Sequence, residues 1–312
     1  MTRGATGASH PRLDDLLELR HQAHSLGIAS HHLVNSAFAG VYASVFRGQG
    51  LNFEEVREYR EGDDIRNMDW KVTARTNKPH LKVYREERER SVVLCVDHGP
   101  HMFFGTRNCF KSVQAARAAA LLGWAANSRH DRVGGLLFGD AEAGLQHFPP
   151  TKDRRALWRL LSELANPSRR AQQGVDCLQL TLQRAERGTG TGALIFVIAD
   201  FNRAIAGLDK ALGQLCQKHA VVVIPVDDPA DRELPAMGHV LFRDAQGELI
   251  EIDTDDAAGR AAYASGWQQR REALRQLCNR LNMTLIPIST EEDVHLSLMQ
   301  GLRRRARVRM RQ

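Results

Sequence analysis

The stretch SVVLCVDHGPHM (91–102) decides the fold class that the sequence predicts. It contains the apolar run VVLCV, which ends at Asp97 and is followed by a loop. Similar runs recur farther along the chain, namely VGGLLF, ALIFVIA, VVVIPV and MTLIPI. Short runs that are rich in Val, Ile and Leu are typical of strands buried on both faces of a parallel sheet.

Helix-like stretches separate these runs. Helices are expected at about 108–129, 152–165, 177–187, 206–219, 259–282 and 292–306. Because strands and helices alternate, we expect an α/β fold with a doubly wound, mostly parallel sheet of the Rossmann type. The stretch GHVLFRDAQGELIEIDT (238–254) interrupts the alternation, and its turn signal at Asp244–Gly247 favours an inserted hairpin.

Residues 1–90 have a different texture. Apolar residues recur at helical spacing within residues 10–26, which predicts an amphipathic N-terminal helix. Residues 40–90 are densely charged and too polar to form a core of their own, with strand-like pieces near Phe53–Arg60 and Leu81–Glu86. The predicted organisation is therefore a helix and a small β-rich appendage over 1–90, the α/β domain over 91–302, and an Arg-rich tail over 303–312.

The composition excludes several classes of protein. With 43% hydrophobic and 26% charged residues, the 312-residue chain is neither disordered nor collagen-like nor a coiled coil. No stretch approaches the run of about 18 apolar residues that a membrane-spanning helix requires, and the start lacks the apolar segment of a secretion signal. The five cysteines are widely spaced without a Cys-x-x-Cys pair, which signals neither a disulfide framework nor a zinc site. We therefore expect a cytoplasmic protein without a membrane span.

The positive charge is concentrated at one end of the chain. The last ten residues, RRRARVRMRQ, hold six arginines and no acid, which equals the whole net charge of +6. Residues 1–302 are therefore formally neutral. A nucleic-acid-binding domain would carry its basic excess on a folded face, so we expect no nucleic acid as partner.

Two aspartates follow apolar runs at places where ligands bind in open α/β sheets. Asp97 ends VVLCVD and Asp200 ends ALIFVIAD, and each precedes a loop. Ligands bind beyond the carboxyl ends of the strands, near the switch in strand order. Carboxylates at these places either hold a hard cation or cap loops by accepting hydrogen bonds from backbone N–H groups.

The segments VVLCVDHGPHM, DRVGGLLFGD and ALIFVIADF resemble the first, second and fourth strands of a von Willebrand factor A domain. The resemblance implies a metal-ion-dependent adhesion site in which Asp97 matches the first Asp of Asp-x-Ser-x-Ser and Asp200 matches the last Asp. Gly99 and His101 stand where the two serines are expected, and GVDCL (174–178) offers Val175 in place of a Thr. A glycine and an imidazole cannot replace two hydroxyl ligands of Mg²⁺, so a degenerate metal site with Asp97 and Asp200 as loop caps is favoured over a bound divalent cation.

The stretch FEEVREYREGDDIRNMDWKVTARTNKPHLKVYREERER strongly resembles the hallmark of a bacterial family called domain of unknown function 58. The residues that fall on the family's motif without a gap are Tyr59, Gly62, Asp63, Asp64, Arg66, Asp69, Trp70, Ala74 and Arg75. The similarity runs from about residue 27 to 300. It implies a von Willebrand A-like domain after the motif and an AAA+ ATPase of the MoxR type as partner, with other von Willebrand A-like proteins as further partners.

The motif also has a physical interpretation of its own. Gly62 supplies a turn, Asp63 and Asp64 can cap a following short helix, Arg66 can pair with carboxylates, and Trp70 offers a large apolar anchor. Two alternatives stay open: the motif pins the appendage to the α/β domain, or it forms a docking surface for a partner. Charge-dense strands at an edge serve solubility first, which favours the former.

The leading hypothesis is a non-enzymatic protein-interaction module without a cofactor, acting as an adaptor or co-chaperone of a MoxR-type ATPase. The alternative is a metal-dependent hydrolase of phosphoesters, suggested by the carboxylates of Asp97, Asp200, Asp63, Asp64 and Asp69. A third hypothesis has the Arg-rich tail steer the protein onto nucleic acid or anionic lipid.

Overall fold

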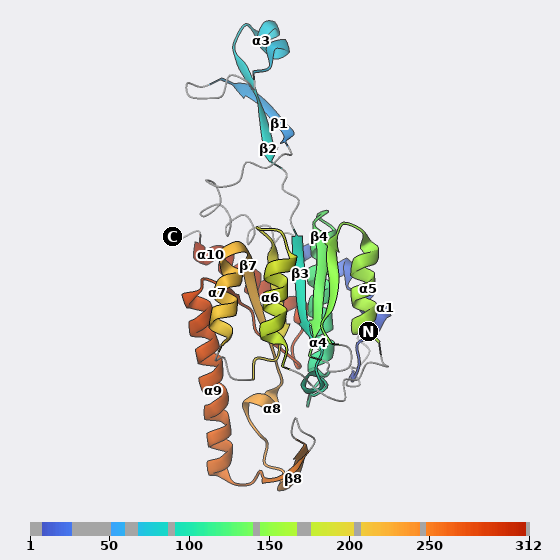
Figure 1. Ribbon diagram of the computed structural model, residues 1–312, viewed down its shortest axis with the longest axis vertical. Helices are drawn as coiled ribbons and strands as arrows, with labels where there is room; N and C mark the ends of the chain where they lie inside the picture. Colours follow the sequence, from blue (N-terminus) through green and yellow to red (C-terminus); the bar gives the residue numbers. More distant parts are fainter. Residues whose placement is uncertain are drawn as a thin grey trace. The chain divides into compact units, whose positions relative to one another are not determined.

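The computed structural model describes residues 8–26, 51–59, 68–86, 91–139, 144–166, 176–202, 207–243 and 248–309. The chain divides into two compact units, one formed by Gly40–Glu89 and the other by Met1–Ala39 together with Arg90–Gln312. The smaller unit carries the charged motif, and the larger unit carries the α/β domain (Figure 1). Each unit is described by itself below.

The larger unit is built on one mostly parallel sheet. Its strands are β3 (Ser91–Asp97), β4 (Arg132–Phe138), β5 (Gln146–Thr151), β6 (Leu194–Ala199), β7 (Ala220–Asp227), β10 (Thr284–Leu285) and β11 (Ile288–Ser289). They lie in the order β10-β7-β6-β3-β4-β5, with β11 also paired to β7, and every pair except β4–β5 is parallel. Counted along the chain, this is the strand order 3-2-1-4-5-6 of doubly wound folds. The predicted fold class is therefore confirmed.

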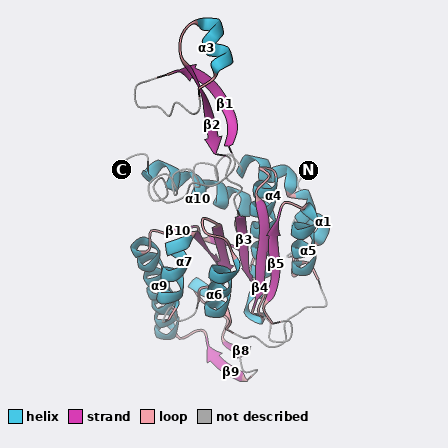
Figure 2. Ribbon diagram, turned by 45° about the horizontal axis from the view of Figure 1, so that its top comes forward, coloured by secondary structure: helices cyan, strands magenta, loops and turns pink. Residues whose placement is uncertain are grey.

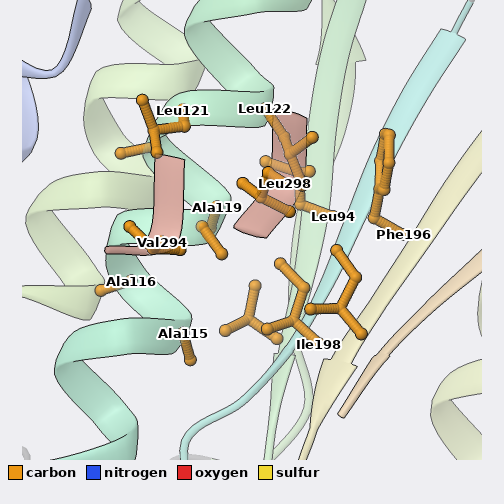
Figure 3. Close-up of a cluster of buried hydrophobic side chains, with 14 of the residues drawn as sticks. Leu94, Ala115, Ala116, Ala119, Leu121, Leu122, Phe196, Ile198, Val294 and Leu298 are labelled. Atoms are coloured by element: carbon orange, nitrogen blue, oxygen red, sulfur yellow. The ribbon is translucent and has the colours of Figure 1, made fainter. Parts of the chain in front are cut away.

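Helices cover both faces of this sheet because successive strand residues point to opposite sides. On one side, Leu94 and Val96 of β3 belong to a core shared with α1 (Leu13–Glu18), α4 (Lys111–Asn127), α5 (Arg154–Leu164) and α10 (Val294–Arg309). On the other side, Val93 and Cys95 belong to a core shared with α6 (Leu178–Gly188), α7 (Leu208–Lys218) and α9 (Ala257–Arg280). Figure 2 shows the two helical layers, and Figure 3 shows Leu94 and Phe196 packed toward α4 and α10.

Strand β5 did not follow from the sequence. Its residues QHFPPT contain Pro149 and Pro150, which cannot donate to a sheet ladder and are tolerated only at an edge. The strand does lie at the edge, antiparallel to β4. Gly134 of β4 permits this close pairing, because a Cβ atom there would lie 2.4 Å from the carbonyl oxygen of Phe148.

The N-terminal helix packs in the larger unit. Leu16 of α1, and Ala23 and Leu26 of the helical residues that follow, lie in the same core as α4. The indole N–H of Trp124 also donates to the carbonyl of Leu16 at 3.0 Å. The helix of the predicted segment 1–90 thus belongs to the α/β unit. Burial of its apolar side chains stabilises this packing, although the helix is close in sequence to the charged motif.

The smaller unit is a two-stranded sheet with one helix. β1 (Leu51–Glu58) pairs antiparallel with β2 (His80–Glu86), and α3 (Trp70–Thr76) lies between them in the chain. The two strands match the strand-like pieces expected near Phe53–Arg60 and Leu81–Glu86.

A second two-stranded sheet follows β7. The short helix α8 (Pro229–Arg232) leads to β8 (His239–Arg243), which pairs antiparallel with β9 (Leu249–Asp253) before α9 begins. These strands occupy the stretch interpreted as an inserted hairpin. Within the described residues, no helix is long and apolar enough to cross a membrane.

Candidate functional site

The two aspartates predicted at the sheet edge lie at the switch in strand order. Asp97 is the last residue of β3, and Asp200 directly follows β6. These two strands are parallel neighbours, with Val96 paired to Ile198. The chain order of the strands reverses between them, which is the place where ligands bind in doubly wound sheets. The structure thus brings both predicted residues to one edge.

A buried lysine occupies the centre of this edge. Lys111 is the first residue of α4, and its Nζ lies 2.7 Å from Oδ2 of Asp200 and 3.1 Å from Oδ2 of Asp231 in α8. The lysine side chain is only 3% exposed and both carboxylates are 8% exposed. The ammonium therefore joins the loops after β6 and β7 from inside the protein.

Lys111, Asp200 and Asp231 form a triad in which Lys111 and Asp200 stabilise each other's charge against burial. Burial disfavours the ammonium, but the carboxylates of Asp200 and Asp231 outweigh it and raise the pKa of Lys111 above its ordinary value. Burial disfavours the Asp200 carboxylate too, yet Lys111 lowers its pKa below the usual range. For Asp231, burial and the charge of Asp200 prevail and raise the pKa. The firm ion pair of the triad is therefore Lys111 with Asp200.

Asp97 is held by its own loop. Its Oδ1 accepts a hydrogen bond from the backbone N–H of Gly99 at 3.1 Å, and its Oδ2 lies 2.9 Å from Nε2 of His101. A Cβ atom at Gly99 would lie 2.7 Å from Cε1 of His101, so the imidazole fills the space beside this glycine. The arrangement matches the interpretation of Asp97 as a loop cap.

A fourth carboxylate joins the loops of the same edge. Asp228 accepts hydrogen bonds from the hydroxyls of Thr106 and Thr290, both at 2.5 Å, and from the backbone N–H of Thr106 at 2.8 Å. Burial raises the pKa of Asp228, but these hydrogen bonds overcome that effect and lower it below the usual range. Here the two threonine O–H groups act as hydrogen-bond donors to a carboxylate and join the loops that carry them.

The donor set at this edge does not fit a tightly held Mg²⁺. Gly99 and His101 replace two hydroxyl ligands, and the carboxylate of Asp200 is bound by the ammonium of Lys111. Val175, the third departure from the adhesion-site pattern, lies outside the described residues. In the part of the chain that the structure describes, no group of three or more His, Cys, Asp or Glu side chains is arranged to hold a metal ion.

The motif residues lie in the smaller unit. The carboxylate of Asp69 caps α3, because its Oδ1 accepts from the backbone N–H groups of Lys71 at 3.0 Å and Val72 at 3.2 Å. Trp70 opens this helix and is 68% exposed, Arg75 is exposed in its last turn, and the N–H of Tyr59 donates to the carbonyl of Pro79 at 2.9 Å. Ala74 also lies in α3, whereas the motif residues Gly62, Asp63, Asp64 and Arg66 lie outside the described residues. A short helix carries the one exposed indole that the structure describes in this motif.

The similarity of this chain to known proteins shows the family to which it belongs. Residues 55–273 match the family described as "Protein of unknown function DUF58". The chain belongs to the DUF58 family. Uncharacterised proteins of Mycobacterium bovis and Mycobacterium tuberculosis are 29% identical to this DUF58 protein over 255 residues, which is 81% of this chain and 79% of each relative.

Among solved structures, the DUF58 protein is similar to the von Willebrand A domain of SpRpn10, with a TM-score of 0.38 and 13% identity. The match covers 68% of this chain and 94% of that domain. A second similar structure is an uncharacterised membrane-spanning protein from Vibrio fischeri, with a TM-score of 0.21 and 14% identity, covering 62% of this chain and 98% of that protein.

Three residues at this edge of the DUF58 protein, Lys111, Asp228 and Asp231, were not predicted from the sequence. The two aspartates follow the run VVVIPV and were open to the same strand-end argument as Asp97. The sequence also contained a signal for the burial of Lys111, because this residue shares one helix face with the buried residues Ala115 and Ala118. A charged residue on an apolar helix face indicates a buried ionic partner, although it does not say which one.

Proposed function

We propose that this DUF58 protein is a non-enzymatic interaction module that acts in the cytoplasm as an adaptor or co-chaperone of a MoxR-type AAA+ ATPase. The observation that carries the proposal is the ion pair of Lys111 with Asp200 at the switch in strand order. The ATPase itself comes from the family resemblance of the motif around Trp70.

The lysine supports binding more than catalysis. In the adhesion-site pattern a divalent cation holds the loops and offers an open coordination position to a ligand. Here an ammonium with 3% exposure holds the loops and offers no open position to solvent. The ion pair thus stabilises this edge of the sheet as a binding surface. Its assembly requires no metal-activated water.

The motif supplies the candidate contact residue. Trp70 is 68% exposed on a helix whose N-terminus is fixed by Asp69. Trp is enriched among the residues that carry most of the energy of protein interfaces, and a capped helix holds it in a defined position. The proposal therefore assigns the docking role to this motif, and the affinity measurements below test that role.

The test is capture of the ATPase by the full chain, followed by affinity measurements with the purified partner. Replacing Trp70 with Ala should weaken binding by about 2 kcal/mol or more. Trp158 on α5 is 48% exposed and gives a matched control, for which Trp158→Ala should leave the affinity within about twofold. No capture of the ATPase, or equal losses for both variants, would refute the proposal.

The alternative is the metal-dependent phosphoester hydrolase. It requires a divalent cation at Asp97 and Asp200, and Lys111 competes for the second of these carboxylates. Calorimetric titration of the purified chain with Mg²⁺, Mn²⁺ and Zn²⁺ separates the two functions. Stoichiometric binding accompanied by turnover of a phosphoester would favour the hydrolase.

A further inference from the structure

The β8–β9 hairpin has one face composed only of apolar side chains. Residues directly opposite each other in an antiparallel pair share a face, and here Val240 lies opposite Ile252 while Phe242 lies opposite Ile250. Ile250 is 47% exposed and Ile252 is 38% exposed, so this face is not buried against α9. Within the described residues, β8 and β9 pair only with each other.

The base of the hairpin is firmly attached to the larger unit. Thr254 is buried, its hydroxyl donates to the carbonyl of Gly238 at 2.7 Å, and its own carbonyl accepts from Nη1 of Arg260 in α9 at 2.6 Å. Helix α9 is in turn attached to α8, because the hydroxyl of Tyr263 donates to the carbonyl of Ala230 at 3.1 Å. The hairpin therefore projects from the same end of the sheet as α8 (Figure 1).

An isolated two-stranded hairpin is at best marginally stable in water. A face of four apolar side chains on such a hairpin indicates that another element covers it. A strand added at the edge of β8 or β9 would leave this face in water, whereas a helix laid across it would cover all four side chains. Five-residue strands are about 17 Å long, which three turns of helix match.

The charge of the hairpin restricts the choice of partner. Residues 237–256 contain six acids, one arginine and His239. Two copies of this acidic hairpin would repel each other, which disfavours a symmetric dimer formed face to face. A helix with Lys and Arg beside its apolar stripe is complementary in both charge and polarity.

We propose that the apolar face of the β8–β9 hairpin binds a basic amphipathic helix of a partner protein. The side chains of Val240, Phe242, Ile250 and Ile252 contact the apolar stripe, and the net negative charge of the hairpin attracts the basic flanks of the helix. This binding does not depend on the identity of the ATPase proposed above, so either proposal can fail alone.

The first experiment uses the full chain and a fluorescent Leu/Lys peptide of about 18 residues, long enough to form an amphipathic helix. Two controls are a Leu/Glu peptide with the same stripe and a Leu/Lys peptide scrambled so that the stripe is lost. Replacing Ile250 and Ile252 together with Thr should weaken binding of the first peptide at least about tenfold. The matched variant replaces Leu241 and Leu249, which are 64% and 61% exposed on the opposite face, with Thr and should change binding less than about twofold.

Each outcome decides the proposal. Binding of the basic striped peptide that depends on Ile250 and Ile252 supports it, provided that the thermal unfolding of the variants matches the original chain. Equal binding of the scrambled peptide, or equal losses in both Thr variants, overturns it, because attraction to acids alone explains such results.

A second experiment identifies the segment in the host cell. A photo-crosslinking amino acid in place of the exposed Met237, next to the hairpin, should capture a partner helix that has Lys and Arg beside an apolar stripe. Capture of an acidic segment, of residues 303–312 from a second copy, or of no segment would overturn the proposal.

Discussion

The Nζ atom of Lys111 lies 2.7 Å from Oδ2 of Asp200, across the point where the strand order of the sheet reverses. The two residues are 89 positions apart in the chain, and both side chains are almost completely buried. Breaking a buried pair by removing one partner leaves an uncompensated charge, which is far more costly than the loss of an exposed pair. The predictions below follow from this relationship and from the loops around it.

Replacement of Lys111 by Met should lower the free energy of unfolding by about 3–5 kcal/mol, because Asp200 then keeps a buried charge without its counterion. Chemical denaturation measures the change. Lys218 pairs with Glu186 on the surface of the same unit and gives the control, since Lys218→Met removes only an exposed ion pair and should lower the free energy of unfolding far less than Lys111→Met. Similar decreases in the free energy of unfolding for Lys111→Met and Lys218→Met would show that the buried ion pair stabilises the fold no more than the exposed one.

The stability of the larger unit should fall in acid, partly through Asp200. The pKa of this carboxyl is lowered in the folded protein, so its stabilisation is complete above its unfolded pKa of about 3.9 and is lost as the pH falls through the folded pKa. Denaturation curves between about pH 6 and pH 2 should therefore show a smaller acid-induced loss for Asp200→Asn than for the original chain. Identical slopes for the two proteins would contradict the assignment.

Replacement of Lys111 by Ser should give the variant a higher affinity for Mg²⁺ than that of the original chain. The change removes the ammonium and leaves the carboxylates of Asp200 and Asp231 beside the space of the deleted side chain, where water can complete the oxygen coordination that Mg²⁺ prefers. Binding to the folded state raises the unfolding temperature, so excess Mg²⁺ should stabilise Lys111→Ser relative to EDTA. A response of the original chain as large as that of the variant would mean that the lysine does not occupy the place of a cation.

Gly139 should be indispensable for the loop that holds Asp97. Its φ is 99°, and a Cβ atom there would lie 2.5 Å from Oδ1 of Asp97. Gly139→Ala should therefore lower the free energy of unfolding by about 2–3 kcal/mol, combining backbone strain with displacement of the carboxylate. Gly144 gives the control, because its φ is 60° with no atom within 4 Å of a Cβ, so Gly144→Ala should cost about 1 kcal/mol. Equal costs would remove the argument for contact with Asp97.

The sequence predicted those features that depend on local patterns. The apolar runs around Val93 and Ile195 predicted buried parallel strands. Asp97 and Asp200 each follow such a run, which predicted that both lie at one edge of the sheet. The family motif also predicted membership of DUF58, which the family match confirms.

Features that depend on distant pairing could not be predicted in the same way. Nothing near Lys111 in the chain shows that its partners follow β6 and β7. Strand β5 lacks an alternating pattern because two of its residues are prolines at a sheet edge. The N-terminal helix was separated from its packing partners by the charged segment 40–89, so its place in the larger unit was not visible from proximity in sequence.

The lysine at the switch in strand order is part of the polypeptide and cannot be withdrawn. A protein whose loops are joined by a soluble ion loses the link between these loops when a chelator or a shift in cellular magnesium removes that ion. Here the charge that joins the loops belongs to a side chain of the protein itself, so this edge of the sheet is complete as soon as the chain folds. A fall in the concentration of free magnesium therefore does not remove the charge of Lys111 that pairs with Asp200.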